Sequence, residues 1–352
     1  MICIFLKKGI LWRQTKCTVF NHCTLQIYFR KDTNMLDVTL LGTGGSIPLP
    51  GRYLSSAIIE YKGRKILMDA GEGTGVSIRE IHSGFKNIDV ICITHLHGDH
   101  VIGLQGILGT ISNTGRKDPI TIIGPEGIKD VMKGFRVIMP WLSYDINIIE
   151  NPNPLNSIVI NNEYIHGELS ISVLPVLHTR PNFAYRVDLK RSPKFNVQKA
   201  IENNVPRQIW KKLQLSESDY IVFNGNKYYK KMVLGDSRDG LRVSWVTDTR
   251  PIDSIPKFID RSDLLMSCAN FGSNNDLDKA KEKMHMTFAE AAEQAKKGHV
   301  KEMVLTHFSQ SLRDPDKYLK NATDIFPNTI IGKDHMHFEI NFDQQFAVPS
   351  IL

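Results

Sequence analysis

The chain contains the sequence Thr94-His95-Leu96-His97-Gly98-Asp99-His100, which places four potential metal ligands within six residues. The preceding residues, 88–94, are mostly apolar and predict a buried strand. A strand that ends in such a loop directs its imidazoles and carboxylate toward one centre. Imidazole nitrogens and carboxylate oxygens suit zinc, and a ligand set without sulfur indicates a catalytic rather than a structural site. The alternative is a solvated histidine-rich turn, which this spacing after an apolar strand disfavours.

Three further ligand types follow predicted strands elsewhere in the chain. His178 closes the run 171–177, Asp248 closes 242–247, and His307 closes 303–306. Taken alone, His178 fits a hydrogen-bonded core histidine equally well, and Asp248 fits the start of a turn. Taken together with the first cluster, they complete seven ligands at strand ends, which is where layered α/β folds build sites. Seven ligands suffice for two metals, and Asp248 is the natural bridge because a carboxylate can contact two cations.

Three other motifs carry a resemblance to a known family. They are Leu41-Gly42-Thr43-Gly44-Gly45-Ser46, Asp69-Ala70-Gly71-Glu72-Gly73-Thr74, and His285-Met286-Thr287-Phe288, which begins 22 residues before His307. With these motifs, the chain from about Met35 to Ile340 resembles the ribonuclease Z family of the metallo-β-lactamase superfamily. The third motif is the most specific, because the superfamily as a whole lacks it.

The resemblance implies an α/β fold, a metallo-β-lactamase four-layer αβ/βα sandwich, with two Zn²⁺ per chain. His95, His97 and His178 would hold one ion, Asp99, His100 and His307 the other, and Asp248 would bridge. Mn²⁺ or Fe²⁺ can occupy such nitrogen and oxygen sites as well. The implied partners are precursor tRNA and a second copy of the chain in a homodimer.

The implied reaction is removal of the 3′ trailer from a tRNA precursor, leaving a 3′-hydroxyl on the tRNA and a 5′-phosphate on the trailer. Asp99 would orient the attacking water and accept its proton. His285 would protonate the leaving oxygen, since Thr287-Phe288-Ala289-Glu290 predicts a capping box that opens a helix over 288–297. A helix start of this kind attracts a phosphate.

The sequence departs from the family pattern in three places, none of which touches a predicted zinc ligand. Tyr53 stands after Arg52 where the family has Asn, residues 310–313 read Gln-Ser-Leu-Arg, and the Gly-Pro element of the RNA-binding arm is absent. Two alternatives therefore stay open. One is a metallo-β-lactamase fold phosphodiesterase or other hydrolase that acts on small substrates, and the other is a non-catalytic RNA-binding module.

Positive charge is concentrated in one segment, 188–231, which holds ten lysine and arginine residues against four acidic ones. It also holds aromatic residues, among them Phe195, Trp210, Tyr228 and Tyr229, and it lies between two predicted metal ligands. We expect an inserted basic exosite arm that binds RNA through its backbone and shape, with short helices over 197–203 and 206–214. The predicted RNA-binding residues are Lys190, Arg191, Lys194, Arg207, Lys211 and Lys212.

Length and composition fit one elaborated domain, 35–345, in a chain of 352 residues that is 41% hydrophobic. No run of eighteen apolar residues predicts a membrane span. The glycine-rich loop at Gly42 is followed by prolines rather than a helix, so we expect no nucleotide cofactor. Five cysteines without disulfide or zinc-finger spacing favour a cytoplasmic protein.

The first 34 residues differ from the rest, with six basic residues against Asp32 alone. We interpret them as a non-native upstream extension, with Met35 as the true start. A transit peptide and a secretory signal are the weaker alternatives, because serine and a cleavage site are missing.

Overall fold

The computed structural model describes residues 35–216, 218–342 and 349–352. The predicted extension over residues 1–34 and the last three residues of the predicted domain lie outside these ranges. Within them, the strands form two large sheets and one small hairpin sheet. No helix of the described residues is both long and apolar enough to cross a membrane.

The first sheet has eight strands in the order β17-β16-β1-β2-β3-β4-β5-β6. β3 to β6 run parallel, whereas the strands toward β17 pair antiparallel. The strands are β1 (Met35–Gly42), β2 (Ser56–Tyr61), β3 (Arg64–Met68), β4 (Ile88–Cys92), β5 (Ile120–Gly124), β6 (Ile146–Glu150), β16 (Met336–Asn341) and β17 (Ser350–Ile351). The accompanying helices are α1 (Thr74–Glu80), α2 (Gly98–Val101), α3 (Leu104–Asn113) and α4 (Ile128–Phe135).

The second sheet has seven strands in the order β15-β14-β13-β12-β9-β8-β7. They are β7 (Ile158–Asn161), β8 (His166–Val176), β9 (Asn182–Arg191), β12 (Arg238–Val246), β13 (Leu264–Cys268), β14 (Glu302–Thr306) and β15 (Thr329–Ile331). Its helices are α7 (Ser254–Phe258), η3 (Asn274–Asp276), α8 (Leu277–Glu282), α9 (Phe288–Lys297), η4 (Pro315–Tyr318) and α10 (Lys320–Thr323).

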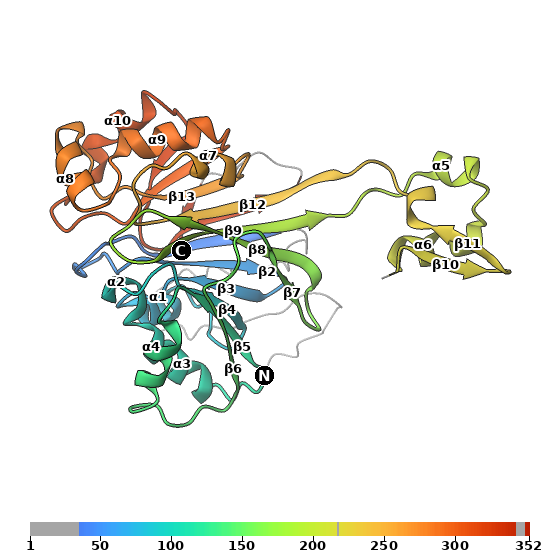
Figure 1. The fold of residues 1–352 in the computed structure, drawn as a ribbon, viewed down its shortest axis with the longest axis horizontal. Helices are drawn as coiled ribbons and strands as arrows, with labels where there is room; N and C mark the ends of the chain where they lie inside the picture. Colours follow the sequence, from blue (N-terminus) through green and yellow to red (C-terminus); the bar gives the residue numbers. More distant parts are fainter. Residues whose placement is uncertain (1–34, 217, 343–348) are drawn as a thin grey trace, which may run out of the picture.

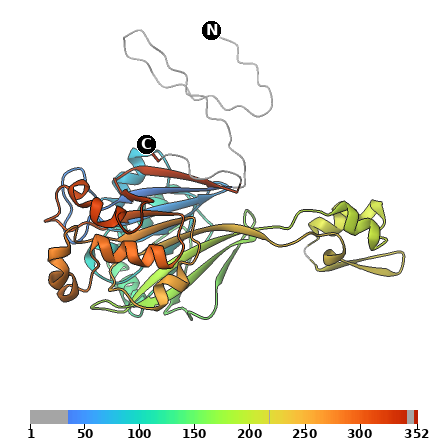
Figure 2. The same ribbon diagram turned by 90° about the horizontal axis from the view of Figure 1, so that it is seen from above.

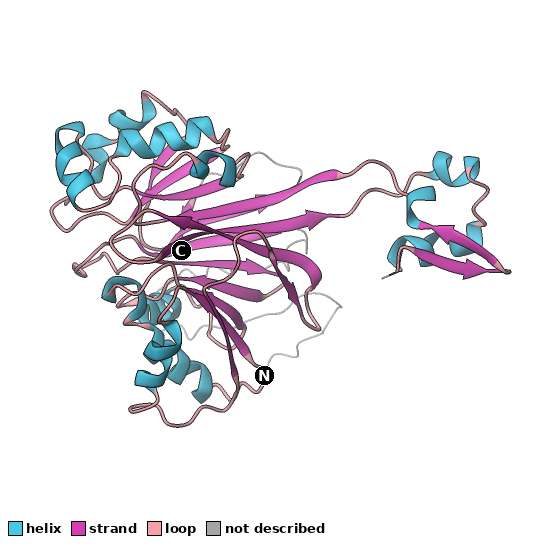
Figure 3. Ribbon diagram, in the orientation of Figure 1, coloured by secondary structure: helices cyan, strands magenta, loops and turns pink. Residues whose placement is uncertain are grey.

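Three apolar cores stack these elements into four layers. The inner faces of both sheets meet in one core, where Leu36, Val38 and Leu40 of β1 join Tyr185 and Val187 of β9. A second core lies between the first sheet and α1, α3 and α4, and a third between the second sheet and α7, α9 and α10. Helices accordingly cover both outer faces of the sheet pair (Figures 1 and 3). The fold is an αβ/βα sandwich, as the sequence predicts.

Between β9 and β12 the chain leaves the sandwich and forms a protruding arm, residues 192–237 (Figures 1 and 2). It comprises α5 (Val197–Glu202), η1 (Arg207–Ile209), α6 (Trp210–Leu215), β10 (Tyr220–Phe223), β11 (Asn226–Tyr229) and η2 (Lys230–Met232). A small core of its own holds it together, formed by Ala200, Val205, Ile209, Leu213 and Val233. The hairpin β10–β11 turns at Asn224 and Gly225, both at positive φ (48° and 77°). Asn-Gly is a strong hairpin signal that the sequence analysis overlooked.

The strands β9 and β12 run from the arm to the edge of the sheets that carries Thr94 and Asp248. β9 begins beside Thr94, whose carbonyl accepts the N–H of Phe183 at 3.1 Å, and it ends at Arg191. β12 returns from the arm and ends just before Asp248. The predicted metal ligands and the arm therefore lie at opposite ends of the same two strands.

Candidate metal centre and active site

The seven predicted metal ligands come together from five different places in the chain. His95 and His97 follow β4, and Asp99 and His100 lie in α2. His178, Asp248 and His307 follow β8, β12 and β14. All five connections are at one edge of the two sheets, where the carboxyl ends of these strands meet. They sort into two groups of four ligand types that share Asp248.

The first group consists of His95, His97, His178 and Asp248, whose ligand atoms all lie within 4.8 Å of one another. Nε2 of His95 is 2.9 Å from Nδ1 of His97, and Nε2 of His178 is 3.3 Å from the same atom. Oδ2 of Asp248 is 3.5 Å from His95 and 3.9 Å from His178. Three imidazoles and a carboxylate around one point form a nitrogen and oxygen set that suits zinc.

The second group consists of Asp99, His100, His307 and the same Asp248. Nε2 of His100 and Nε2 of His307 are 3.1 Å apart. Oδ2 of Asp99 lies 3.7 Å from His100 and 3.4 Å from His307. The Asp99 carboxylate is held in place by the backbone N–H of Ser46, which donates to Oδ2 at 2.6 Å.

Asp248 is the residue that the two groups have in common. Its Oδ2 faces His95 and His100, whereas its Oδ1 is 3.1 Å from Nε2 of His307. Within the described ranges, Oδ1 is buried and has no hydrogen-bond partner. A buried carboxylate oxygen without a donor is costly unless a cation compensates it. The donor set and this oxygen therefore fit two metal ions that share one carboxylate.

Backbone strain accompanies these side chains. Asp248 and His307 adopt left-handed φ angles of 48° and 59°, and Asp69 has 55°. Such conformations cost energy for residues other than glycine and persist where the surroundings enforce them, often at functional sites. All three residues follow a strand, and their side chains meet at the common edge.

Asp69 orients the second group from behind, a role that the sequence analysis missed. Its Oδ1 accepts the backbone N–H of Thr94 at 2.8 Å, and its Oδ2 accepts Nε1–H of Trp245 at 3.0 Å. The same Oδ2 is 2.9 Å from Nδ1 of His100, which leaves Nε2 of that ring facing Asp248. A carboxylate behind a ligand histidine fixes its tautomer and orientation. Asp69 follows the apolar strand β3, the same signal that identified Asp248.

The histidines fall into two electrostatic classes. Burial lowers the pKa of His95, and it lowers the pKa of His178 to about 4, so both rings are neutral. Burial also acts on His100, but Asp248 and Asp69 outweigh it and raise the pKa to about 10. In His307 the Asp248 carboxylate and a hydrogen bond to Asp99 outweigh burial and raise the pKa. The carboxylates around His100 and His307 thus favour positive charge at these two rings. A bound metal ion would supply that charge in place of the ring protons.

His285 lies beside both groups. Its ring centroid is 5.2 Å from that of His178 and 5.5 Å from that of His307, on which it stacks. Nδ1 is 3.5 Å from Sγ of the buried Cys268, a residue that no ligand spacing in the sequence identifies. The predicted capping box is confirmed, because Thr287 and Glu290 cap α9 reciprocally. His285 is thus held between the metal-ligand groups and the start of a helix.

The glycine-rich loop after β1 has a packing function here. A Cβ atom on Gly45 would lie 2.5 Å from Cε1 of His307, so the backbone must approach the imidazole closely at this point. The next residue supplies the N–H that holds Asp99. The loop therefore supports the second ligand group.

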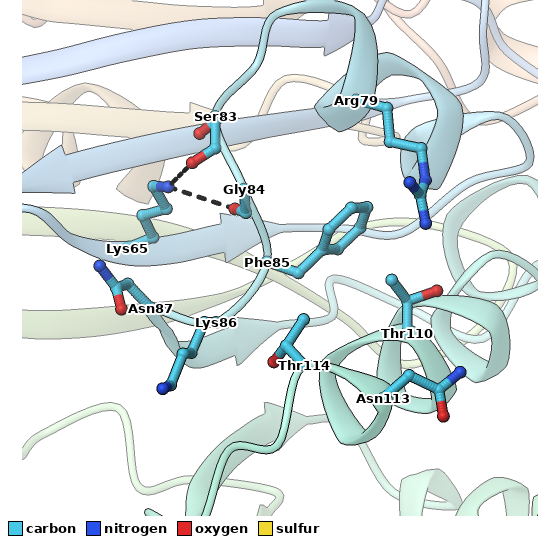
Figure 4. A pocket seen from close by; sticks show the side chains of 10 residues that line it. All are labelled: Lys65, Arg79, Ser83, Gly84, Phe85, Lys86, Asn87, Thr110, Asn113 and Thr114. Carbon is cyan, nitrogen blue, oxygen red and sulfur yellow. Dashed lines mark hydrogen bonds between the residues drawn. The ribbon is translucent and has the colours of Figure 1, made fainter. Parts of the chain in front are cut away.

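A surface cavity of about 600 Å³ lies elsewhere, between the β3–β4 connection, α1 and α3 (Figure 4). Its lining includes Lys65, Arg79 and Phe85 but none of the ligand residues. Lys65 donates to the carbonyl oxygens of Ser83 and Gly84. Its ammonium is thus used to hold a turn, and the cavity is separate from the candidate centre.

The predicted RNA-binding residues divide between strand and arm. Lys190 and Arg191 belong to β9, because that strand continues to Arg191 before the chain leaves the sheet. Lys194, Arg207, Lys211 and Lys212 lie beyond it, the last three on η1 and α6. Arg207 is placed over the ring of Trp210, 5.6 Å from its centroid.

An αβ/βα sandwich whose strand ends gather histidines and aspartates into paired groups defines the metallo-β-lactamase class of hydrolases. Among solved structures, the short form of human tRNase Z matches with a TM-score of 0.61 and 25% identity, over 87% of this chain and 100% of that one. The metallo-β-lactamase fold protein YhfI of Bacillus subtilis matches with a TM-score of 0.60 and 18% identity, over 87% of this chain and 100% of that one.

Sequence comparison narrows the class. Ribonuclease Z of Clostridium tetani is 51% identical over 312 residues, 88% of this chain and 99% of that protein. Ribonuclease Z of Clostridioides difficile is 48% identical over 310 residues, 88% of this chain and 100% of that protein. A family model described as Anti-Pycsar protein Apyc1 matches residues 36–211 and ends within α6. The chain belongs to the ribonuclease Z family, and it is a phosphodiesterase of the endoribonuclease type.

Proposed function

We propose that this enzyme is a two-zinc endoribonuclease that removes 3′ trailers from tRNA precursors. The observation that carries the proposal is the pair of ligand groups sharing Asp248, with His285 beside them, in a chain about half identical to ribonucleases Z. The products would be a tRNA with a 3′-hydroxyl and a trailer with a 5′-phosphate.

The metal assignment follows the two groups. His95, His97 and His178 would hold one ion, Asp99, His100 and His307 the other, and Asp248 both; Mn²⁺ or Fe²⁺ fit the same donors. When bound, the ions supply an activated water and neutralise negative charge on the phosphoryl oxygens. Oδ1 of Asp248 supports this assignment, because it is buried, accepts no hydrogen bond from the described residues and lies 3.1 Å from Nε2 of His307.

Asp99 and His285 are proposed to move protons. Asp99 is kept ionised, because hydrogen bonding and charge from His307 and His100 outweigh burial and lower its pKa. An ionised carboxylate on the rim of the ligand groups orients a water and accepts its proton. His285 lies two residues before Thr287, the N-cap of α9, and the positive end of that helix dipole attracts a phosphate. From that position its imidazole protonates the 3′-oxygen of the tRNA as its bond to phosphorus breaks.

The arm is proposed to hold the body of the tRNA. Lys194, Arg207, Lys211 and Lys212 extend on a separate module, with Lys190 and Arg191 at its base. Basic side chains that neutralise phosphates give affinity that depends on salt and is independent of sequence. Such contacts suit a substrate class that shares a shape.

A homodimer in the cytoplasm completes the proposal. Val137, Ile138 and Trp141, after α4, are 84%, 68% and 70% exposed, an apolar surface of the kind that partners cover. The cysteines of the described ranges, Cys92 and Cys268, are free thiols, which suits a reducing compartment. Sedimentation analysis of the pure protein tests the dimer.

Incubating the pure enzyme with a precursor tRNA and, separately, with bis-(p-nitrophenyl) phosphate tests the proposal. We expect cleavage of the precursor at one position, with end-labelling showing the 3′-hydroxyl and 5′-phosphate products. Cleavage of the small ester alone would indicate a hydrolase of small substrates. Binding of tRNA without cleavage of either substrate would indicate a non-catalytic RNA-binding module.

A further inference from the structure

A second basic surface lies outside the arm, in a groove of about 560 Å³ on the outer face of the second sheet. Its floor is formed by β8, β9 and β12, and its wall by the connections that follow α7 and α9. Figure 1 shows β9 and β12 running from beneath α7 to the arm, so the groove occupies the stretch between the helical layer and the arm.

The floor of the groove is a sheet face that changes character along its length. Near the metal ligands, the outward side chains of β9 and β12, Ala184 and Val246, belong to the apolar core beneath α7 and α9. Farther along the same face the outward positions are Arg186, Asp188 and Arg242. Since charged side chains cannot lie under an apolar helix layer without cost, this half of the face stays open to solvent.

The groove carries a surplus of positive charge. Seven lysine and arginine side chains line it, against three aspartates. Arg186 and Arg242 share one carboxylate, Asp188, at 2.9 and 2.7 Å. Carbonyl oxygens hold both guanidinium groups from the other side, those of Phe258 and Asp260. The arginines are therefore fixed in position, and one carboxylate cannot neutralise two of them.

The lining also indicates what kind of ligand fits. Within the described residues, no phenylalanine, tyrosine or tryptophan lines the groove, and the one ring there, the imidazole of His299, is paired with Asp260. Fixed guanidinium groups instead match the oxygens of phosphates. Arg238, at the end nearest the arm, donates to the carbonyl of Ser192, the first residue of the arm. The positive surface is therefore continuous from the groove to the arm.

We propose that this groove binds the phosphodiester backbone of RNA that the arm holds, as a second electrostatic contact separate from the arm. The proposal rests on the function proposed above and extends its RNA-binding surface onto the body of the sandwich. Each phosphate contact releases counterions, so the groove contributes to the salt dependence of binding.

The test is the double variant Arg261→Gln/Lys301→Gln. Both side chains line the groove wall, are 67% and 65% exposed, and lie outside the arm and the metal centre. We expect the slope of log Kd for precursor tRNA against log salt concentration to fall by about 1–2 units, at roughly 0.7–0.9 per lost phosphate contact. Turnover of bis-(p-nitrophenyl) phosphate should stay at the wild-type value.

A matched control is Lys129→Gln/Lys133→Gln on α4, in the opposite helical layer. These lysines also pair with carboxylates, those of Glu150 and Asp130, and the substitution removes the same charge. We expect this variant to bind RNA like the wild type. Because Lys301 pairs with the buried Asp263, the single variant Arg238→Gln provides a second measurement that leaves that pair intact.

The outcomes separate the groove from the function. If the wild type binds and cuts precursor tRNA and both groove variants keep its salt slope, the groove proposal is wrong and the function stands. If RNA binding depends on the groove but no precursor is cut, the groove proposal stands and the function is wrong. If the wild type binds no RNA, both are wrong.

Discussion

Replacing His285 with alanine tests the proton-donor role. The imidazole stacks on His307 and faces Cys268, whereas the start of α9 is held by other groups. Thr287 and Glu290 form the capping box, and Glu290 also pairs with Arg250. The start of the helix therefore does not depend on the His285 side chain, and we expect His285→Ala to keep its fold, its metal content and its affinity for tRNA.

The size of the kinetic effect follows from general acid catalysis. Loss of a positioned acid typically costs about 10²–10⁴-fold in rate, or roughly 2.7–5.4 kcal/mol of barrier. This loss should appear in kcat for precursor tRNA, whose leaving oxygen is a poor leaving group. It should shrink below about tenfold for bis-(p-nitrophenyl) phosphate, because p-nitrophenolate leaves without a proton and the acid step no longer contributes.

The assay is single-turnover cleavage of both substrates, with metal measured by elemental analysis. His337→Ala is the matched control, since this histidine contacts Thr39 and Asp37 of β1 and none of the ligand residues, and it should leave both rates unchanged. Equal losses on the two substrates, or loss of metal in His285→Ala, would refute the assignment and make His285 a support for His307.

Three other changes have defined outcomes. Asp248→Ala removes the carboxylate common to both ligand groups, so it should lose at least one metal ion per chain and nearly all hydrolysis. Elemental analysis measures the metal content. Two retained metal ions together with wild-type turnover would contradict this prediction. Residues 192–237 can be replaced with a two-residue turn, because Arg191 and Arg238 are paired across β9 and β12. The shortened protein should still cut small esters, while its affinity for tRNA and the salt dependence of that affinity fall. An unchanged affinity would show that the arm does not bind the tRNA. Asp89→Ala should lower the free energy of unfolding by about 3–5 kcal/mol in denaturant titration, because two buried arginines lose their shared carboxylate; a change below about 1 kcal/mol would show that the network tolerates the loss.

The sequence was informative where one strong pattern recurs. A polar ligand after an apolar strand located the ends of β4, β8, β12 and β14, and the capping box located α9 within its observed bounds. Asp69 carries the same pattern after β3, but its role depends on facing His100 across the fold. That proximity arises from the packing of two sheets and is not encoded in local spacing.

Other features depend on tertiary context even more. Cys268 has no ligand-like neighbours in sequence and acquires them only where β13 ends beside His285 and His307. The residue at which the arm begins also depends on tertiary structure. Lys190 and Arg191 belong to a basic run in the sequence, but in the fold they continue β9. The open groove cannot be read from β9 alone, since it depends on where α7 stops covering the sheet.

A crystal structure of the zinc-loaded protein, with anomalous scattering measured on both sides of the zinc absorption edge, tests the central claim most directly. We expect two anomalous peaks per chain, about 3.5 Å apart. One peak should be ligated by His95, His97 and His178, the other by Asp99, His100 and His307, with Asp248 contacting both. A single peak, or two peaks of which Asp248 touches only one, would contradict it.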